Sequence, residues 1–413
     1  MENPRVWFRS ISLENVRSFG RKQTIYFTED GTENGPVARW NVLLGDNGTG
    51  KTTVLKGLVV MVQNQHVIYE TGVSLAELWR FGEEDIGAII NGIVINGDEN
   101  LTIGFTVKPL TKHTGSIFQF TRTYEIEMTL SAYRASRQIS SSAISTNRLN
   151  PINDFFLEEN NLTNAEEWLI QADYLALKNV QQRSKYGVVK HILLDLMRDE
   201  ISDIRIDVSS GTPKVFFKTH YGDVRLHELS LGYKTLIAWT VDFAKGLLDR
   251  YSDSPNPLAE PAVCLVDEID LHLHPKFQRT IIKFLTETFP NTQFIVTAHS
   301  PLVVQAAEDY NANLIVLKRE GDETVVTSGL EVRNWRVDQI LASDLFEGIP
   351  SRSTETEQKM IRRRALLRKD SLASAEQEEL TQLEQELDNL PVSESWEAIK
   401  AMDIIKRAAF NQV

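Results

Sequence analysis

The sequence predicts an α/β fold, in which buried strands alternate with helices around one large core. Three observations predict it. The glycine-rich stretch "GDNGTGKTT" at 45–53 lies between an apolar strand-like run and a segment with helical spacing. Two further apolar runs, "AVCLV" and "TQFIVT", each end in polar residues, as buried parallel strands often do. The length of 413 residues corresponds to about two or three lobes.

Each element follows from its local pattern. Strands are expected where apolar residues alternate or form short runs, at 5–16, 23–27, 39–44, 101–110, 116–133, 201–229, 262–270, 292–300 and 312–330. The segments 101–110 and 116–133 are expected to complete a sheet beside the glycine-rich turn. Helices are expected where apolar residues recur every three or four positions, at 51–65, 164–198, 233–250 and 275–289. Residues 137–165 are rich in Ser and Asn, which predicts a loop.

The composition is that of a globular protein, with 42% apolar and 24% charged residues. A formal net charge of −13 excludes a global basic field for nucleic acid but leaves room for a local basic groove. The single Cys264 excludes an intramolecular disulfide and fits a reducing compartment, where it is expected to be a small buried apolar side chain. No signal-peptide core or membrane-spanning run is found, so we expect a cytoplasmic protein without a membrane partner.

The glycine-rich stretch carries the strongest chemical signal. Gly45, Gly50, Lys51 and Thr52 match every fixed position of the phosphate-loop pattern. Backbone N–H groups of such a loop hold the β-phosphate, Lys51 is expected to reach the β- and γ-phosphates, and the Thr52 hydroxyl is expected to bind Mg²⁺. The predicted nucleotide-binding residues of this loop are Gly45, Asp46, Asn47, Gly48, Thr49, Gly50, Lys51, Thr52 and Thr53.

Two further motifs follow buried strands. In "VCLVDEID", Asp267 is expected to hold Mg²⁺ and Glu268 to activate the attacking water; the alternative is an ordinary acidic turn. In "FIVTAHS", His299 is expected at the end of a strand beside the Asp267 strand, where it can contact the γ-phosphate or the attacking water. Its alternative is a structural histidine. The pair His272 and His274 in "LHLHP" is not expected to bind metal, because zinc sites need three or four protein ligands.

A second anion site is expected far from the loop. In "HELSLGYKT", Ser230 and Gly232 precede a helix, whose first N–H groups are free to bind an anion. Two copies related by a two-fold axis could then bury two ATP molecules, each between the loop of one copy and the Ser-Gly helix start of the other. The alternative is that Ser230 is simply the N-cap of its helix.

These motifs together resemble one family. "LSLGYKT" resembles the signature motif of ABC-type ATPases, and "ISLENVRSFG" resembles the first strand of SMC, RecF and OLD-type ATPases. The resemblance covers about residues 6–318 and implies a P-loop NTPase of ABC/SMC-head type with an inserted helical lobe. It implies that ATP drives a homodimer or a higher even oligomer, in which Ser230 and Gly232 contact the partner's γ-phosphate. It also implies that Asp270 and Leu271 cross the interface and that a glutamine, here Gln138 after Arg134, senses Mg²⁺.

The sequence departs from the larger members of this group. SMC-type proteins carry long coiled coils between the two nucleotide motifs, but no sustained heptads occur between Thr53 and Asp267. OLD-type nucleases add a metal-dependent nuclease, and we find no Asp-x-Asp pair after His299. The compact layout resembles the ATPases of the anti-phage systems Septu, certain retrons and PARIS, where the ATPase regulates a separate nuclease or toxin. The alternatives are a RecF-like repair ATPase that binds DNA itself and a nuclease with an unrecognised site.

The C-terminal part predicts a helical extension. Residues 354–370, a segment from Ser374 with a capping-box pattern to Gln377, and 393–410 have helical patterns. A leucine stripe runs along the second, and basic residues gather on the first: Arg362, Arg363, Arg364, Arg368 and Lys369. The extension is either a helical cap or hairpin, or a docking surface, and its basic residues either face solvent or touch a phosphate backbone. Four parts result: 1–135 and 201–344 for the ATPase head, 136–200 for a loop and helical lobe, and 345–413 for the extension.

Overall fold

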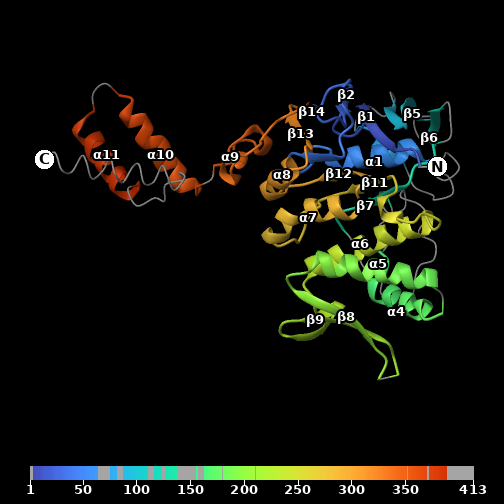
Figure 1. Ribbon diagram of the computed structural model, residues 1–413. Coiled ribbons are helices and arrows are strands. Elements are labelled where there is room, and N and C mark those ends of the chain that lie inside the picture. Colours follow the sequence, from blue (N-terminus) through green and yellow to red (C-terminus); the bar gives the residue numbers. More distant parts are fainter. Residues whose placement is uncertain are drawn as a thin grey trace. The chain divides into compact units, whose positions relative to one another are not determined.

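The computed structural model describes residues 3–63, 75–80, 87–109, 116–122, 126–136, 155–156, 162–178, 180–209, 211–350, 352–369 and 372–387. The chain forms two compact units, Met1–Ile340 and Leu341–Val413 (Figure 1). The larger unit carries the nucleotide motifs. The division into four parts remains a prediction from the sequence.

The larger unit contains a six-stranded sheet with the strand order β14-β13-β3-β12-β11-β7. Its strands are β3 (Trp40–Leu44), β7 (Leu130–Tyr133), β11 (Ala262–Val266), β12 (Thr292–Thr297), β13 (Asn313–Glu320) and β14 (Glu323–Ser328). All neighbours from β13 to β7 pair in parallel, and β14 pairs antiparallel to β13. Every residue of β3, β11 and β12 is buried, which explains their nearly continuous apolar runs.

A second, antiparallel sheet has the order β2-β1-β4-β5-β6. Its strands are β1 (Val6–Glu14), β2 (Gln23–Tyr26), β4 (Ala88–Asn96), β5 (Glu99–Pro109) and β6 (Ser116–Arg122). Strand β4 was not expected from the sequence, although alternate residues of its first half are buried. The expectation that 116–133 belongs to one sheet is wrong: β6 pairs with β5, whereas β7 pairs with β11 in the central sheet.

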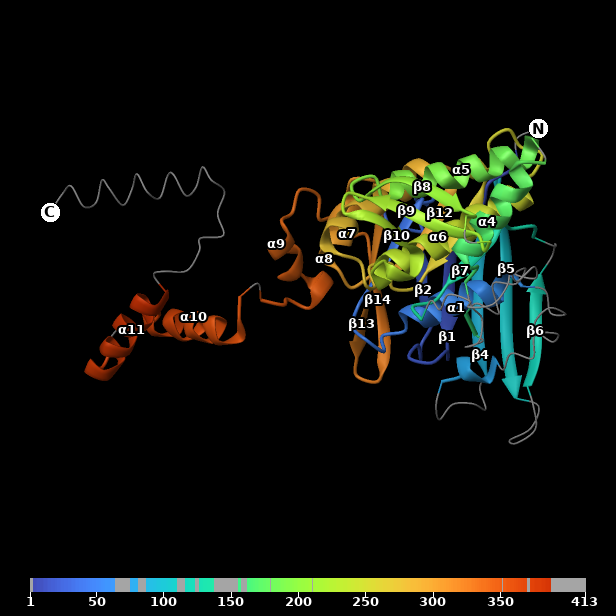
Figure 2. The ribbon, with the colours of Figure 1, turned by 90° about the horizontal axis from the view of Figure 1, so that it is seen from below.

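Helix α1 (Lys51–Val62) packs between the two sheets. Leu55, Leu58 and Val59 are fully buried in one cluster with side chains from both sheets. Figures 1 and 2 show the antiparallel sheet beside α1. The helix therefore has a fixed position, and so has the glycine-rich loop that leads into it.

A buried amide joins β12 of the central sheet to β1 of the antiparallel sheet. The Gln293 side chain is fully buried, accepts the backbone N–H of Phe8 at 2.8 Å and donates to the carbonyl of Phe8 at 2.8 Å. It also donates to the carbonyl of Ala38 at 3.2 Å. Gln293 thus acts like one residue of a paired strand, and it satisfies backbone groups that would otherwise be buried without partners.

Helices α6 (Leu231–Arg250), α7 (Pro275–Thr288) and α8 (Pro301–Glu308) also belong to this unit, and α9 (Val337–Leu341) lies at its end. Phe243 of α6 packs on Phe294 of β12 with ring centroids 6.4 Å apart, and Phe294 stacks on Trp40 of β3 at 4.3 Å. The aromatic side chains therefore join α6 to the centre of the sheet. Short 3₁₀ helices in this unit are η1 (Leu75–Leu78), η2 (Leu226–Glu228) and η3 (Pro257–Ala259), whereas η4 (Asp344–Phe346) belongs to the smaller unit.

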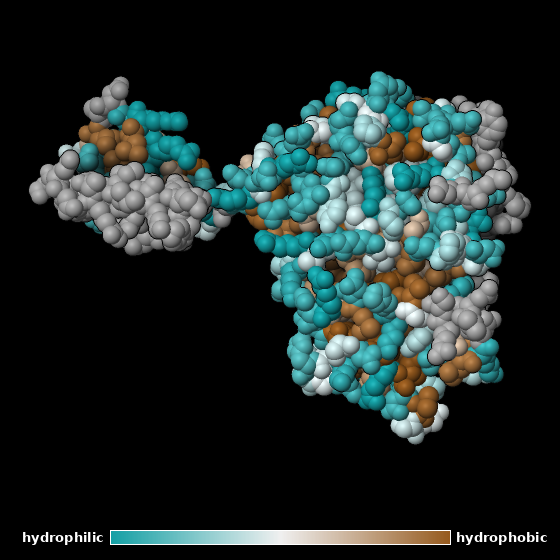
Figure 3. All heavy atoms as spheres, viewed as in Figure 1, coloured by the Kyte–Doolittle hydropathy of each residue, from teal (hydrophilic) through white to brown (hydrophobic). Residues whose placement is uncertain are grey.

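The helical lobe consists of α4 (Ala165–Ala176) and α5 (Val180–Leu196), and a three-stranded sheet follows it. That sheet has the order β10-β9-β8, with β8 (Ile201–Asp207), β9 (Lys214–Thr219) and β10 (Gly222–Arg225). Three apolar side chains, Tyr174, Leu175 and Leu177, are exposed at the end of α4. Figure 3 shows hydrophobic patches on the lower part of the face of the larger unit that is seen in this view. Within the described part of the chain, no helix is both long and apolar enough to cross a membrane.

The smaller unit contains a helical hairpin of α10 (Thr354–Leu367) and α11 (Ser374–Leu387). Leu366, Leu380 and Leu383 are buried together, so two leucines of the predicted stripe on α11 pack against α10. Ion pairs join Lys359 to Glu386 at 3.0 Å, Arg362 to Glu379 at 2.7 Å and Arg363 to Glu384 at 3.1 Å.

Three of the basic residues predicted to face either solvent or phosphate are therefore paired across the hairpin: Arg362, Arg363 and Lys369. The expected capping box at Ser374 and Gln377 is replaced, because Ser374 is already helical and the Glu376 carboxylate accepts the N–H of Ala373. The helix expected at 393–410 lies outside the described residues.

Candidate functional site

The order of the strands brings the three polar motifs to one edge of the central sheet. Strands β3, β12 and β11 are adjacent and parallel, so their carboxyl ends face the same side. The glycine-rich loop follows β3, His299 follows β12, and Asp267 follows β11. Open α/β sheets bind ligands at this edge. The expectation that the His299 and Asp267 strands are neighbours is confirmed by the pairing of β11 with β12.

Glycine is required at two positions of the loop for steric reasons. Gly45 has a φ of 138°, and a Cβ there would lie 2.2 Å from the carbonyl oxygen of Leu317. Gly50 has a φ of 96°, and its Cβ would lie 2.7 Å from Ser18 Oγ. Side chains at these positions would push the loop away from its neighbours. The loop is braced further by Thr324 Oγ1, which donates to the carbonyl of Thr49 at 2.9 Å.

Lys51 lies inside the loop with only 7% of its surface exposed. Its ammonium donates to the carbonyls of Gly45 at 2.6 Å and Asp46 at 2.9 Å. Burial lowers the pKa of Lys51, while the negative charge of Asp267 and other acidic side chains acts in the opposite direction. An incoming phosphate would supply the counter-charge that this buried ammonium needs.

The hydroxyl of Thr52 meets the acidic motif directly. Thr52 Oγ1 donates to Asp267 Oδ2 at 2.8 Å, and Thr297 Oγ1 donates to Asp267 Oδ1 at 2.7 Å. Thr297 Oγ1 also accepts the backbone N–H of Glu268 at 2.6 Å, so β12 holds both acidic residues in place. Thr52 and Asp267 present adjacent oxygen atoms of the kind that Mg²⁺ prefers, and this donor set fits the ion.

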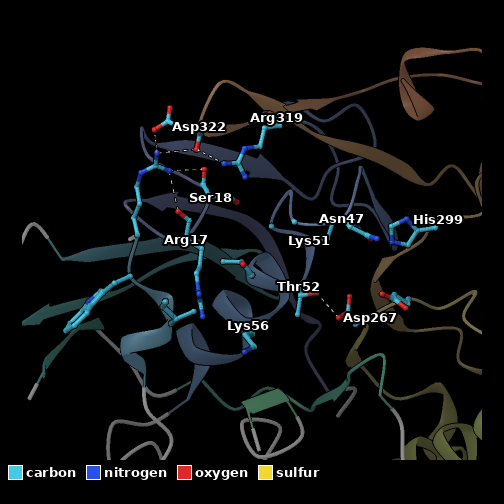
Figure 4. Close-up of a pocket in the computed structure, with 17 residues that line it drawn as sticks. Arg17, Ser18, Asn47, Lys51, Thr52, Lys56, Asp267, His299, Arg319 and Asp322 are labelled. Carbon is cyan, nitrogen blue, oxygen red and sulfur yellow. Dashed lines mark hydrogen bonds and ion pairs between the residues drawn. The ribbon is translucent and has the colours of Figure 1, made fainter. Parts of the chain in front are cut away.

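These residues line a cavity of about 670 Å³. Its walls consist of Arg17, Ser18, Asn47, Gly48, Gly50, Lys51, Thr52, Thr53, Lys56, Leu78, Trp79, Arg80, Asp267, Glu268, His299, Arg319 and Asp322. Figure 4 shows Asp267 and His299 on one side of the cavity and Arg17, Ser18, Arg319 and Asp322 on the other (Figure 4). The motifs predicted from the sequence therefore share one cavity with residues that were not predicted.

The unpredicted side is organised by Arg80. Its guanidinium donates to the carbonyls of Arg17 at 3.4 Å and Ser18 at 3.3 Å, and it pairs with the Asp322 carboxylate at 2.6 Å. Arg319 also donates to the carbonyl of Asp322, at 3.5 Å. Arg80 thus joins the turn after β1 to the β13–β14 hairpin. A signal for Arg17 and Ser18 was present in "ENVRSFG", the stretch on which the family resemblance partly rests.

His299 is positioned through its backbone. Its N–H donates to Asp270 Oδ2 at 2.8 Å, and Asp270 is itself 8% exposed. The next residue, Ser300, caps α8 by accepting the N–H of Leu302 at 3.1 Å. The imidazole of His299 is solvent-exposed and lines the cavity.

Ser230 and Gly232 do not occur among the described residues that line this cavity. Ser230 is exposed and caps α6, accepting the N–H of Tyr233 at 3.5 Å. Gly232 is buried, and a Cβ there would lie 2.2 Å from the carbonyl oxygen of His272. The capping interpretation therefore holds within one chain, and Gly232 has a packing requirement that the sequence did not indicate.

The remaining candidates lie elsewhere. His274 accepts the N–H of Lys276 at 3.3 Å and caps α7, which begins at Pro275 as expected. Among the residues that the structure describes, no group of three or more His, Cys, Asp or Glu side chains is arranged to hold a metal ion. Arg134 directly follows β7, and Gln138 lies outside the described residues.

A phosphate loop between a buried parallel strand and a helix, facing an acidic pair on a nearby strand, defines a P-loop ATPase domain. The chain belongs to the family described as "AAA domain, putative AbiEii toxin, Type IV TA system", whose model matches residues 40–305.

Several curated proteins are similar to this chain. The Septu protein PtuA of Bacillus mycoides (strain KBAB4) is 25% identical over 351 residues, which is 82% of this chain and 45% of the relative. The retron Vc95 probable ATPase of Vibrio cholerae serotype O1 biovar El Tor is 38% identical over 126 residues, covering 30% and 24% of the two chains. The retron Ec83 probable ATPase of Escherichia coli is 39% identical over 115 residues, which is 27% of this chain and 21% of the relative. The chain thus spans less than half the length of these relatives.

Solved structures of ATPase heads are also similar. An SMC head domain from Pyrococcus yayanosii aligns with a TM-score of 0.49 at 14% identity, covering 78% of this chain and 97% of that one. The recombination mediator protein RecF aligns with a TM-score of 0.42 at 15% identity, covering 79% of this chain and 99% of that one.

Proposed function

We propose that this chain hydrolyses ATP with Mg²⁺ at a site completed by a second copy, and that the nucleotide state controls a partner effector in anti-phage defence. The observation that carries the catalytic part is the contact of Thr52 with Asp267 beside Glu268, in the same cavity as Lys51. Lys51 would neutralise the β- and γ-phosphates, and Thr52 with Asp267 would hold Mg²⁺. The bound ion would screen the phosphate charge.

Glu268 is proposed to orient and deprotonate the attacking water. Its backbone N–H donates to Thr297 Oγ1, which fixes the position of Glu268 just after the carboxyl end of β11. His299 lines the same cavity and is proposed to contact the γ-phosphate. A general base must lie within hydrogen-bond reach of the attacking water. Glu268 and His299 both line the cavity in which the γ-phosphate would lie beside the phosphate loop.

The dimer explains why Ser230 is exposed at a helix start, away from its own chain's cavity. We propose that this helix start faces the nucleotide of a second copy, where its free N–H groups would bind the γ-phosphate. Gly232 would contribute to the same site, in addition to its packing against His272. Two copies would then bury two ATP molecules in a homodimer or a higher even oligomer.

The defence role is supported by the names of the relatives, a Septu protein and two retron ATPases. The resemblance to such systems implies an ATPase that regulates a separate nuclease or toxin, and we propose that arrangement here. A cytoplasmic location goes with it, and a buried single cysteine, Cys264, suits that reducing compartment. Direct action on DNA is the competing outcome, and the pairing of Arg362 and Arg363 with glutamates leaves fewer free charges for a phosphate backbone.

The test is the native mass of Glu268→Gln, purified from its own host with Mg²⁺-ATP. This change removes the proposed base but spares Thr52 and Asp267, so the ATP-bound state should accumulate. Even-numbered oligomers that carry an additional protein chain are the expected result. A monomer would contradict the dimer, and a dimer with DNA alone would favour a RecF-like repair function.

Two variants separate the parts of the proposal. Lys51→Ala should abolish ATP binding, since it removes the buried ammonium of the loop; unchanged ATP affinity would contradict the site. Ser230→Arg should leave ATP binding by the monomer intact but block hydrolysis and ATP-driven dimerisation. Normal turnover by this variant would contradict the shared site while leaving the assignment of Lys51 untouched.

A further inference from the structure

Two loops at the mouth of the cavity are joined by a side chain that contacts neither the cavity nor the acidic pair. The first loop, residues 268–274, contains Glu268 and Asp270; the second, residues 298–300, contains His299. Between them lies Gln278, in the first turns of α7. Its Oε1 accepts the hydroxyl of Ser300 at 2.8 Å, and its Nε2 donates to the carbonyl of Leu273 at 3.0 Å and that of Asp270 at 3.4 Å.

The orientation of this amide is fixed by its neighbours. Two carbonyl oxygens require a donor, so the NH₂ group must face Leu273 and Asp270, and the amide oxygen is left for Ser300. Ser300 is 7% exposed and also caps α8. Gln278 therefore uses both ends of its side chain to hold the second loop against the first.

The first loop needs such a restraint. Glu268 has a φ of 49° and His272 a φ of 61°, so two non-glycine residues in this short loop adopt the left-handed conformation. L-residues avoid this region, and they stay there only where the surroundings hold them. Side chains hold the loop at three points, in addition to backbone bonds such as that from the Ile269 N–H to the Thr297 carbonyl. Thr297 Oγ1 accepts the N–H of Glu268, the Asp270 carboxylate accepts the N–H of His299, and the Gln278 amide donates to the carbonyl of Leu273.

Gln278 is not needed to attach α7 itself. The helix is anchored by four buried side chains on its other turns, Ile281, Ile282, Phe284 and Leu285. Its start is secured by His274 as the N-cap and by Pro275. Loss of the Gln278 amide should therefore disturb the two loops locally rather than unfold the helix.

We infer that Gln278 is a positioning residue for ATP hydrolysis: it fixes the distance between Glu268 and His299 by locking their loops together. The inference rests on the proposed function of these two residues. It also gives a role to "HLHPKFQ", the stretch that follows the acidic motif. The same loop touches the start of α6, because the His272 carbonyl packs on Gly232. Gln278 thus joins the residues around one chain's own nucleotide to the helix start proposed to face the partner's nucleotide.

The test compares Gln278→Met with Gln305→Met in the 413-residue chain, in otherwise identical ATPase assays. Methionine keeps the shape and size of the side chain but loses its hydrogen bonds. Gln305 on α8 is the matched control, because its Nε2 donates to a single backbone carbonyl, that of Trp335, away from the cavity. For Gln278→Met we expect kcat to fall by roughly 10- to 100-fold, since small misplacements of catalytic groups have effects of this size. The Kd for ATP should change by less than about twofold, because the phosphate loop is untouched.

A double-mutant cycle tests whether Gln278 acts through His299. In a His299→Ala background, Gln278→Met should lower kcat by a smaller factor than in the wild type, because one of the two groups that it positions is already absent. Full additivity of the two losses would overturn the inference. So would a kcat equal to that of Gln305→Met, or a parallel fall of kcat, ATP affinity and melting temperature, which would mark a merely structural residue.

The proposed function fails separately. If the wild-type protein does not hydrolyse ATP, or if Lys51→Ala and Glu268→Gln turn over ATP normally, then the catalytic assignment itself is wrong. If those variants are inactive but Gln278→Met matches its control, only the positioning role is wrong.

Discussion

Replacing Gly232 by alanine tests the close contact between the start of α6 and the loop that carries His272. In the structure, the new Cβ would lie 2.2 Å from the His272 carbonyl oxygen, and real Cβ contacts essentially never fall below 3.0 Å. The neighbour is backbone, so the helix start or the loop must move. Overpacking of this kind costs about 1–3 kcal/mol, and we expect Gly232→Ala to lower the free energy of unfolding by that amount.

Gly246→Ala is the matched control in the same helix. Gly246 is exposed in the interior of α6, and nothing lies within 4 Å of the Cβ it would gain. Alanine is a better helix former than glycine by about 1 kcal/mol, so this variant should be more stable than the wild type. The same substitution is therefore expected to change the free energy of unfolding in opposite directions at these two positions of α6.

The assay is urea unfolding followed by circular dichroism, at low protein concentration and without nucleotide, so that neither ATP nor a second copy stabilises the fold. Gly232→Ala should unfold at a lower urea concentration than the wild type, and Gly246→Ala at a higher one. If Gly232→Ala is as stable as the wild type, the packing argument is refuted. The need for glycine would then have to come from the partner's nucleotide alone.

Three further predictions concern stability. Gln293→Leu should cost about 2–5 kcal/mol in urea unfolding, because the buried N–H and carbonyl of Phe8 lose their partner; a loss below 1 kcal/mol would contradict the link between the sheets. Burial raises the pKa of Glu308 above 4.5, so its ionised form destabilises the fold as pH rises from 4.5 through the folded pKa. Glu308→Gln keeps an acceptor for the Val332 N–H but cannot ionise, so its free energy of unfolding relative to the wild type should rise with pH over this range. A relative free energy that falls with pH would contradict the assignment. Leu366→Ala removes a fully buried side chain of the α10–α11 hairpin and should destabilise that unit by about 2–5 kcal/mol, seen as faster hydrogen exchange within 354–387.

The edge of the central sheet that carries the three polar motifs was predictable because its signals are local. The phosphate loop, Asp267 and His299 each directly follow a run of buried apolar residues, and the carboxyl ends of parallel strands converge. The sequence also predicted that the strands before Asp267 and His299 are neighbours, which the β11–β12 pairing confirms.

The other side of the cavity could not be predicted, because it depends on contacts between distant residues. Arg80 and Asp322 are 242 positions apart, and neither stands in a motif. Strand β7 looked continuous with the preceding β segment, yet its partner is β11, more than a hundred residues later in the chain. Gly232 shows the limit most clearly: its local pattern fits an anion site, whereas its buried position reflects the nearby carbonyl of His272.

The interleaving of distant strands has a consequence for biosynthesis. Phe8 and Gln293 are 285 positions apart, and Asn41 of β3 bonds to Asn313, 272 positions away. The strand before the phosphate loop therefore leaves the ribosome with neither of its sheet neighbours yet made. At about 5–20 residues per second, this apolar strand waits on the order of 15 to 60 s for its partners. The nascent chain is thus unable to form its nucleotide site during most of its synthesis, and it needs protection from aggregation until β12 and β13 emerge.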